Sequence, residues 1–355
     1  RVLSRGPSTD PTSWRRGLII GHSHIGDVLY RTCSLEQLKA GLPACSWDYL
    51  TSPASEPILR GNPALDAVLP FTLGDDSSHV TQQSFDQLRQ AQYDVVLCTN
   101  TVRHLPDFVR AVRLGIPNRV GFGDKGYSGL LTMPVATEHP QPLAGYFRTL
   151  VGAAVGKTPD WPLRPRVFPS ASDRERADAC LSRLRLDPSL PTIACTATTR
   201  QLVGAWPTAF FGDVLERFAT KRASNVVLFG AASDAPILHD IAHSLPSPVH
   251  VVAGELAWLE FAEVLRRCDA LLTMDSGPRH LANAVGTPVA FARNLSFARV
   301  EAGTYCTNEV DLAPVEAEGM IDRDIAAFAR STSVVERAAE VLLELLTRSR
   351  VERSG

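Results

Sequence analysis

The sequence predicts an α/β protein built from two Rossmann-like domains, and three observations lead to this expectation. Short apolar runs of strand length alternate with amphipathic runs of helix length, this alternation occurs twice, and a proline-rich stretch separates the two series. Alternating strands and helices form a parallel sheet with helices on both faces. The chain has 355 residues, which is enough for two domains of roughly 150 residues each.

The first series defines the predicted N-terminal domain, residues 17–165. It follows a polar stretch at 1–16 that we expect to be a flexible leader. The expected strands are 18–20, 47–50, 68–71, 93–98 and 120–122. The expected helices are 28–40, 85–91 and 108–114.

The second series defines the predicted C-terminal domain, residues 170–330. The expected strands are 192–195, 226–229, 250–252, 271–274 and 289–292. The expected helices are 207–219, 235–244, 259–267 and 278–285. The stretch 158–169 contains four prolines, and because proline interrupts regular elements we expect the domain boundary there.

Two residue pairs have the spacing of a capping box, in which a serine and a glutamate three positions later stabilise the start of a helix. Ser172 with Glu175 predicts a helix start near residue 173, and Ser333 with Glu336 predicts one near 334. The second helix, 334–346, would close the fold within a C-terminal segment at 331–355.

Composition narrows the classes of function. Hydrophobic residues make up 45% and charged residues 21% of the chain, and the net charge is −2. These values exclude a disordered chain and give no basic field that would attract nucleic acid. No apolar run approaches the roughly 18 residues of a membrane span, although peripheral membrane contact stays open.

The seven cysteines are scattered, odd in number and form no C-x-x-C pair. This spacing argues against a disulfide framework and against a clustered metal site. We therefore expect core thiols, a cytoplasmic location, and no metal.

The loops that follow the strands carry the candidate chemistry, because ligands of open α/β sheets bind beyond the carboxyl ends of the strands. The segment LLTMDSGPRHLANAVGTP, residues 271–288, ends a strand, turns, and opens a helix near Pro278. Such a turn presents backbone N–H groups to an anion. The candidate ligands of a phosphate are Asp275, Ser276, Gly277 and His280. The alternative is a plain turn capped by Asp275 or Ser276.

The loop after the first strand, in LIIGHSHIGDVLY, contains a carboxylate, Asp27. It is either the N-cap of the next helix or a general base that removes a proton from a hydroxyl. The other polar or flexible candidates in this loop are His22, Ser23, His24 and Gly26.

A third loop, TATTRQLVGAWP, follows the strand at 192–195. Hydroxyls at Thr198 and Thr199 and the guanidinium of Arg200 suit an anionic ligand. A solvated connection is the alternative interpretation.

Taken together, these segments resemble the ADP-heptose:lipopolysaccharide heptosyltransferases of glycosyltransferase family 9. The motifs GHSHIGDVLY, RGNPALDAVLPF, ATTR…WP and MDSGPRHLANAVGTPVA occur in the family's order over residues 17–300. The resemblance implies the GT-B fold, two Rossmann-like domains facing a cleft. It also implies inverting transfer of a sugar from a nucleotide sugar, without a cofactor or a required metal.

The resemblance also implies residue roles. Asp27 corresponds to the general base, and the candidates at 275–280 correspond to the block that binds the donor diphosphate. Thr198, Thr199 and Arg200 match a segment near the donor phosphates. Glu260 matches an acidic residue that holds the donor ribose, with a solvated helix residue as the alternative.

The sequence departs from the family pattern at three places. In the loop after the first strand, His22 and His24 stand where Lys, Arg, Ser or Thr are more common in the family. A lysine commonly precedes the W-P pair, where this chain has residues 201–205, QLVGA. Arg293-Asn294 stands where members often show F-G-P-T. Arg200 is then the nearest cation to balance the leaving-group charge.

The expected activity is transfer of a sugar, heptose by resemblance, from an ADP-linked donor onto a hydroxyl of a glycan or natural-product scaffold. Two alternatives stay open: a nucleotide-sugar epimerase of the same fold, and a non-catalytic nucleotide-sugar-binding homologue.

Overall fold

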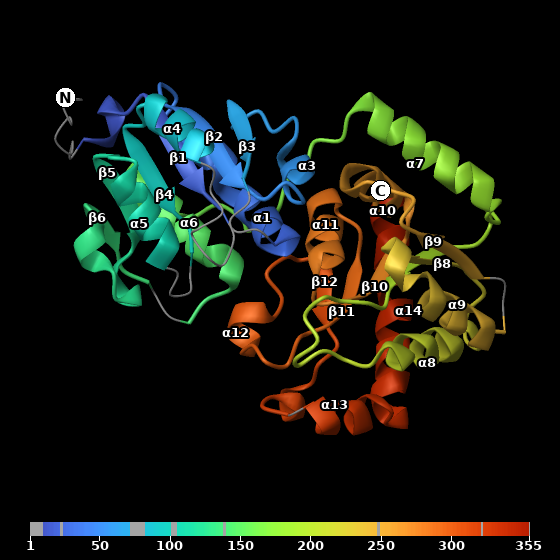
Figure 1. The fold of residues 1–355 in the computed structure, drawn as a ribbon. Coiled ribbons are helices and arrows are strands. Elements are labelled where there is room, and N and C mark those ends of the chain that lie inside the picture. The colour runs from blue at the N-terminus through green and yellow to red at the C-terminus, as the bar shows by residue number, and fades with distance from the viewer. Residues whose placement is uncertain are drawn as a thin grey trace. The chain divides into compact units, whose positions relative to one another are not determined.

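The computed structural model describes residues 10–21, 24–71, 82–100, 105–137, 140–246, 249–320 and 322–354. The chain divides into two compact units, residues 1–168 and 169–355. Both are layered α/β structures (Figure 1).

The first unit contains a six-stranded, wholly parallel sheet with the order β3-β2-β1-β4-β5-β6. Its strands are β1 (Arg16–Ile20), β2 (Ser46–Thr51), β3 (Ala67–Pro70), β4 (Val95–Cys98), β5 (Asn118–Phe122) and β6 (Met133–Val135). Its α-helices are α1 (Ile25–Arg31), α2 (Leu35–Gly41), α3 (Glu56–Leu59), α4 (Gln82–Gln90), α5 (Leu105–Arg113) and α6 (Leu143–Val155).

Helices cover both faces of this sheet. Leu18 and Ile20 of β1 face a core completed by Phe85 of α4 and Phe108 of α5, while α1, α2 and α6 pack together and α6 also packs against β5. Because both faces are buried, β1 and β4 are continuous apolar runs rather than alternating ones.

The expected leader is ordered from residue 10 onward. Asp10 caps a short 3-10 helix, η1 (Pro11–Ser13). Trp14 is buried, and Arg16 already belongs to β1. Residues 1–9 lie outside the described part of the chain.

The second unit repeats the architecture with the strand order β12-β11-β10-β7-β8-β9, again all parallel. Its strands are β7 (Thr192–Thr196), β8 (Asn225–Gly230), β9 (Val249–Ala253), β10 (Ala270–Met274), β11 (Val289–Ala292) and β12 (Glu309–Asp311). Its α-helices are α7 (Ala171–Leu184), α8 (Thr208–Ala219), α9 (Ala235–Ser244), α10 (Trp258–Arg267), α11 (Gly277–Val285), α12 (Arg299–Ala302), α13 (Asp322–Ala329) and α14 (Thr332–Ser354).

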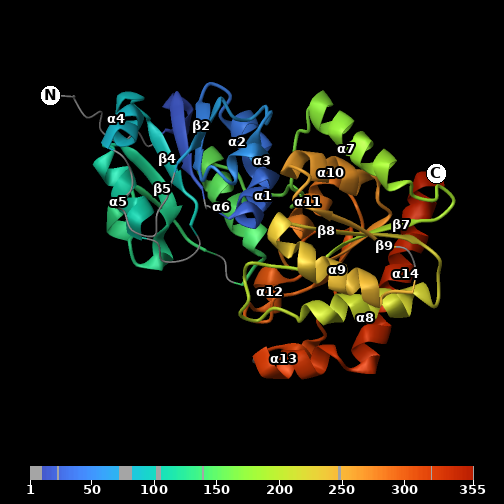
Figure 2. The same cartoon turned by 45° about the vertical axis from the view of Figure 1, so that its right-hand side comes forward.

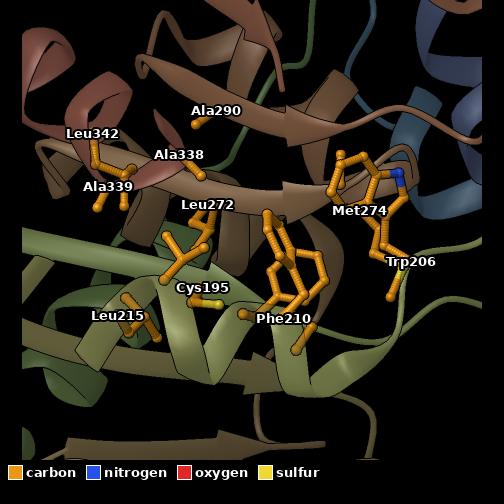
Figure 3. Close-up of a cluster of buried hydrophobic side chains, with 14 of the residues drawn as sticks. Cys195, Trp206, Phe210, Leu215, Leu272, Met274, Ala290, Ala338, Ala339 and Leu342 are labelled. Carbon is orange, nitrogen blue, oxygen red and sulfur yellow. The ribbon is translucent and has the colours of Figure 1, made fainter. Parts of the chain in front are cut away.

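The core of this unit lies under α8, α9 and α14. Figure 2 shows α8 and α9 on one side of the sheet and α7 and α10 on the other. In the close-up of Figure 3, Leu342 of α14 and Phe210 of α8 point toward Leu272 of β10. The indole of Trp206 packs on Phe210 at 4.7 Å between ring centroids, and its Nε1 donates to the carbonyl of Arg293 at 3.0 Å.

Several elements differ from the sequence-based expectation. The expected helix 28–40 is divided into α1 and α2 by a 3-10 turn, η2 (Thr32–Ser34). The elements without a counterpart in the expectation are α3, β6, α6, α12, β12 and α13.

Both expected capping boxes were wrong in detail. The box at the start of α7 consists of Ser170 and Asp173 rather than Ser172 and Glu175. Ser333 lies inside α14, which begins at Thr332. In both cases the helix begins two residues before the expected start.

The expectation of core thiols was confirmed, because all seven cysteines are free and six are buried. Among the described helices, none combines the length and the apolar character needed to cross a lipid bilayer.

Candidate functional site

Each sheet has a topological switch point, where the strand order reverses, and ligands of such sheets bind at the carboxyl ends of the strands there. In the first sheet the switch lies between β1 and β4, and in the second between β7 and β10. Asp27 follows β1, Thr198–Arg200 follow β7, and the segment 275–280 follows β10. The topology therefore brings the candidate residues to the crevice of each unit.

In the second sheet, the neighbouring strands β7 and β10 are joined near their carboxyl ends by a buried hydrogen bond. It links the hydroxyls of Thr196 and Thr273, which lie 2.5 Å apart. Helix α11 then begins with Ser276 as its N-cap residue and proline in its first turn. The Ser276 side chain makes no capping bond; its Oγ donates to the carbonyl of Met274 at 3.3 Å. No acidic residue lies in the first turn of α11, so its positive end keeps its attraction for an anion.

Asp275 does not cap this helix either. Its Oδ1 accepts a hydrogen bond from the Nη1 of Arg279 at 2.7 Å. Arg279 is only 1% exposed and its guanidinium lies 3.5 Å from the centre of the Phe291 ring. Burial alone would lower the pKa of Arg279, but the carboxylates of Asp275 and Glu309 raise it above its ordinary value. Sequence reasoning missed this residue, although its place within the DSGPRH motif was a usable signal.

His280, the last residue of the motif, is half-buried. Its Nδ1 is hydrogen-bonded to the hydroxyl of Tyr305 at 2.7 Å, and the two rings lie 5.6 Å apart. The hydrogen bond at one ring nitrogen fixes the orientation of the imidazole and the role of the other nitrogen.

The threonine hydroxyls at the start of the loop after β7 form hydrogen bonds within the protein. Thr198 Oγ1 donates to Asp234 Oδ2 at 2.9 Å, and Thr199 Oγ1 accepts from the backbone N–H of Gln201 at 3.2 Å. Arg200 is exposed.

Glu260 is not a solvated helix residue, because it is only 7% exposed. Its Oε2 accepts from the backbone N–H of Ala257 at 2.8 Å at the start of α10, and its Oε1 pairs with Arg176 of α7 at 2.6 Å. The carboxylate therefore caps a helix in addition to any contact with a ligand.

Two of the three places that depart from the family pattern, residues 201–205 and 293–294, lie against each other. Asn294 Nδ2 donates to the carbonyl of Val203 at 2.9 Å, and the N–H of Leu295 donates to the carbonyl of Gly204 at 2.9 Å. Gly204 has φ +74°, and a Cβ there would lie 2.4 Å from Asn294 Oδ1. Arg293 is a core residue, fully buried and paired with Asp311 at 2.9 Å.

In the first unit, Asp27 lies in the first turn of α1, and the N-cap residue is His24. The interpretation of Asp27 as an N-cap is therefore wrong. The phenol of Tyr30 donates to Asp27 Oδ1 at 2.6 Å, and His24 Nδ1 lies 3.6 Å from Oδ2. The Asp27 side chain is 25% exposed and that of His24 is 75% exposed, so the carboxylate is held by Tyr30 and is still partly accessible to solvent.

Buried groups surround this carboxylate. Arg31 is fully buried, and its guanidinium lies 5.3 Å from the centre of the Tyr30 ring. A Cβ at Gly21 would lie 2.2 Å from the Tyr49 ring, so only glycine allows β1 to end against that ring. Gly26 is half-buried in the first turn of α1, while His22 and Ser23 lie outside the described residues.

Two Rossmann-like units, each with polar loops at its switch point, define the GT-B class of transferase fold. Residues 82–290, more than half of the chain, match the sequence model of glycosyltransferase family 9 (heptosyltransferase). The chain belongs to this family and is a glycosyltransferase.

Curated relatives and solved structures agree with this assignment. The chain is 25% identical to lipooligosaccharide heptosyltransferase 2 of Haemophilus influenzae over 77% of this chain and 81% of that protein. It is 24% identical to lipopolysaccharide heptosyltransferase 2 of Escherichia coli over 77% and 80%. The fold is similar to a glycosyl transferase family 9 structure from Veillonella parvula, with a TM-score of 0.76 at 17% identity over 97% of this chain and 100% of that chain. It is also similar to the structure of E. coli ADP-heptose lps heptosyltransferase II, with a TM-score of 0.71 at 19% identity over 94% and 99%.

Proposed function

We propose that this glycosyltransferase moves a heptose from ADP-heptose onto a hydroxyl of a glycan acceptor, with inversion at the anomeric carbon and without a metal ion. The relatives named above are heptosyltransferases of lipopolysaccharide and lipooligosaccharide, and one is described with ADP-heptose. The observation that carries the proposal is the uncapped N-terminus of α11 at the switch point of the second sheet.

The proposed reaction is a single displacement. The acceptor oxygen forms a bond to the anomeric carbon while the bond from that carbon to the β-phosphate oxygen breaks. The electron pair leaves with ADP, and Asp27 takes the proton of the acceptor hydroxyl. Tyr30 supports this role because its hydrogen bond to Oδ1 orients the carboxylate of Asp27.

The charge that develops on ADP needs donors and positive potential. The N-terminus of α11, the Ser276 hydroxyl and the His280 ring lie in one segment that supplies them. Arg200 is exposed near the end of β7 and adds a cation in place of the lysine that is common in the family. These groups would stabilise the negative charge on the departing ADP, which metal-dependent transferases stabilise with a divalent ion.

The donor is tested by isothermal titration calorimetry with ADP, GDP and UDP. ADP should bind most tightly, and incubation with ADP-heptose and a heptose-deficient lipopolysaccharide should release ADP at the same rate with and without EDTA. Release that stops in EDTA would contradict metal independence. The anomeric configuration of the product, read by NMR, tests inversion.

The base is tested by Asp27→Asn. General-base assistance is typically worth about 100–10,000-fold in rate, so kcat should fall at least about 100-fold while the Kd for ADP stays within about twofold.

The matched control for the base is Glu36→Gln, which changes an exposed first-turn carboxylate of α2. It should leave kcat unchanged. Near-normal turnover by a folded Asp27→Asn protein would refute the assignment of the base.

A further inference from the structure

The buried carboxylate of Glu309 is bonded to Arg279 and Asn283 of α11, the helix that carries part of the proposed donor-binding segment. Glu309 belongs to β12, the three-residue edge strand of the second sheet. Its side chain is fully buried. Burial acts to raise the pKa of Glu309, but the charge and hydrogen bonds of Arg279, with bonds from Asn283 and Tyr305, bring it below its ordinary value. Glu309 is therefore a charged group in the interior.

One arm of the network from Glu309 reaches Asp275. Glu309 Oε2 accepts from Arg279 Nε at 2.8 Å, and Oε1 accepts from Arg279 Nη2 at 3.1 Å. Nη1 of the same guanidinium donates to Asp275 Oδ1 and to the carbonyl of Ala302, each at 2.7 Å, and Nη2 also donates to the carbonyl of Gly303 at 2.5 Å. A guanidinium fixed by this many acceptors allows Asp275 little freedom.

A second arm reaches His280. Glu309 Oε1 also accepts the backbone N–H groups of Tyr305 and Cys306 at 2.5 and 3.0 Å. These bonds fix the backbone from which the Tyr305 phenol reaches His280 Nδ1. Asn283, one turn further along α11, donates to Glu309 Oε2 at 2.8 Å and ties the helix itself to the carboxylate.

We propose that Glu309 is a positioning residue for the donor. Through Arg279 it fixes the carboxylate of Asp275, and through Tyr305 it fixes the imidazole of His280. This inference rests on the proposed function, because the positioned groups are those assigned to the donor diphosphate. Glu309 and Tyr305 themselves need not contact the donor.

A purely structural ion pair is the competing explanation. It would stabilise the second unit but would not act through Asp275 or His280. Double-mutant cycles separate the two explanations, because residues that act through one another have non-additive effects.

The first cycle combines Tyr305→Phe with His280→Ala and measures the Kd for ADP by calorimetry. Loss of one hydrogen bond that orients His280 should weaken ADP binding about 3–10-fold in the wild-type background. In the His280→Ala background the same change should leave the Kd within about 1.5-fold. An equal weakening in both backgrounds would overturn the His280 arm.

The second cycle combines Glu309→Gln with Asp275→Asn. Glutamine keeps the shape and can still accept the two backbone N–H groups, but it loses the charge that orients Arg279. ADP binding should weaken at least about tenfold when Asp275 is present and by less than about twofold when it is not. Additive effects would overturn the Asp275 arm.

The two cycles remain informative if one variant does not fold. Should Glu309→Gln unfold the unit, Arg279→Lys, which keeps the positive charge, replaces it in the second cycle. A lysine reaches one carboxylate but cannot bridge Asp275, Glu309 and two carbonyls together.

Failure of this inference is distinguishable from failure of the proposed function. A wild-type protein that binds no ADP would overturn both. A wild-type protein that binds ADP, with additive effects in both cycles, would overturn only the positioning role.

Discussion

The Asp27 carboxylate differs from an ordinary first-turn acid because a buried phenol holds one of its oxygens. Burial raises the pKa of Tyr30 well above 10, and the neighbouring charge of Asp27 raises it further. A raised pKa keeps the phenol protonated to higher pH, so Tyr30 remains a donor to Asp27 throughout the neutral and moderately alkaline range.

Tyr30→Phe should therefore lower kcat about 3–10-fold, because the carboxylate loses one orienting hydrogen bond. The fall should be the same at every pH between 7 and 9.5, since the phenol does not titrate there. The measurement is a pH profile of kcat for both proteins. A difference that disappears as the pH rises toward 9.5 would contradict this prediction.

Because of Glu309, the free energy of unfolding should depend on pH in the acid range. The pKa of Glu309 in the folded protein lies below the value of an unfolded glutamate, about 4.3. The stabilisation it provides is present above pH 4.3 and is lost as the pH falls through the folded pKa.

Urea unfolding of the wild-type protein and Glu309→Gln should therefore differ most near pH 7, and the difference should shrink below about pH 4. A difference in unfolding free energy that is constant from pH 7 to pH 3 would contradict the lowered pKa.

At the scale of elements, local pattern predicted the central strands and the helices that follow them well, because a buried parallel strand is a compact apolar run. It could not predict the break between α1 and α2. Thr32 Oγ1 accepts from the N–H of Arg166 at 2.8 Å, and Ser34 Oγ accepts from the indole of Trp161 at 2.9 Å. These partners are more than 120 residues away, so no local pattern contains them.

The edge strands show the same limit. β6 and β12 have only three residues each, which is too few for a periodic signal. In β12 the first residue is the buried Glu309, and a charged residue argues against a strand when its partner Arg279 is unknown. The motif residues could be named from the sequence, whereas the groups that hold them could not.

The loop after β7 depends on Gly204, whose φ of +74° is strained for other residues. Gly204→Ala should displace the contact with Asn294 and weaken ADP binding at least about threefold, because the same loop carries Thr198–Arg200. The readout is the Kd for ADP by calorimetry.

The control for Gly204 is Gly319→Ala. Gly319 also has a positive φ, +80°, but apart from its chain neighbours no atom of the described residues lies within 4 Å of its added Cβ. It should lower stability without changing the Kd. Equal effects of the two substitutions on ADP binding would refute the role of the Gly204 contact.

At the scale of the whole molecule, each unit has its own hydrophobic core. Unfolding by heat should therefore show two calorimetric transitions, of which ADP raises only the one that belongs to residues 169–355. At a ligand concentration of about 100 times Kd the stabilisation is about 2.7 kcal/mol, or roughly 5–10 °C for a domain of this size.

Leu342→Ala assigns the transitions. Leu342 is fully buried against the second sheet, and its truncation should destabilise that unit by about 2–5 kcal/mol. The transition that it lowers should be the one that ADP raises. If ADP raised the temperature of the other transition instead, the nucleotide would bind the first unit, and this would contradict the donor assignment.

The mutual hydrogen bonds between residues 201–205 and 293–296 have a practical consequence for protein engineering. Grafting the lysine-containing segment of a homologue into this scaffold would leave Asn294 opposite a backbone for which it was not selected. Chimeras should therefore exchange the two segments together, and natural substitutions in one should be accompanied by substitutions in the other.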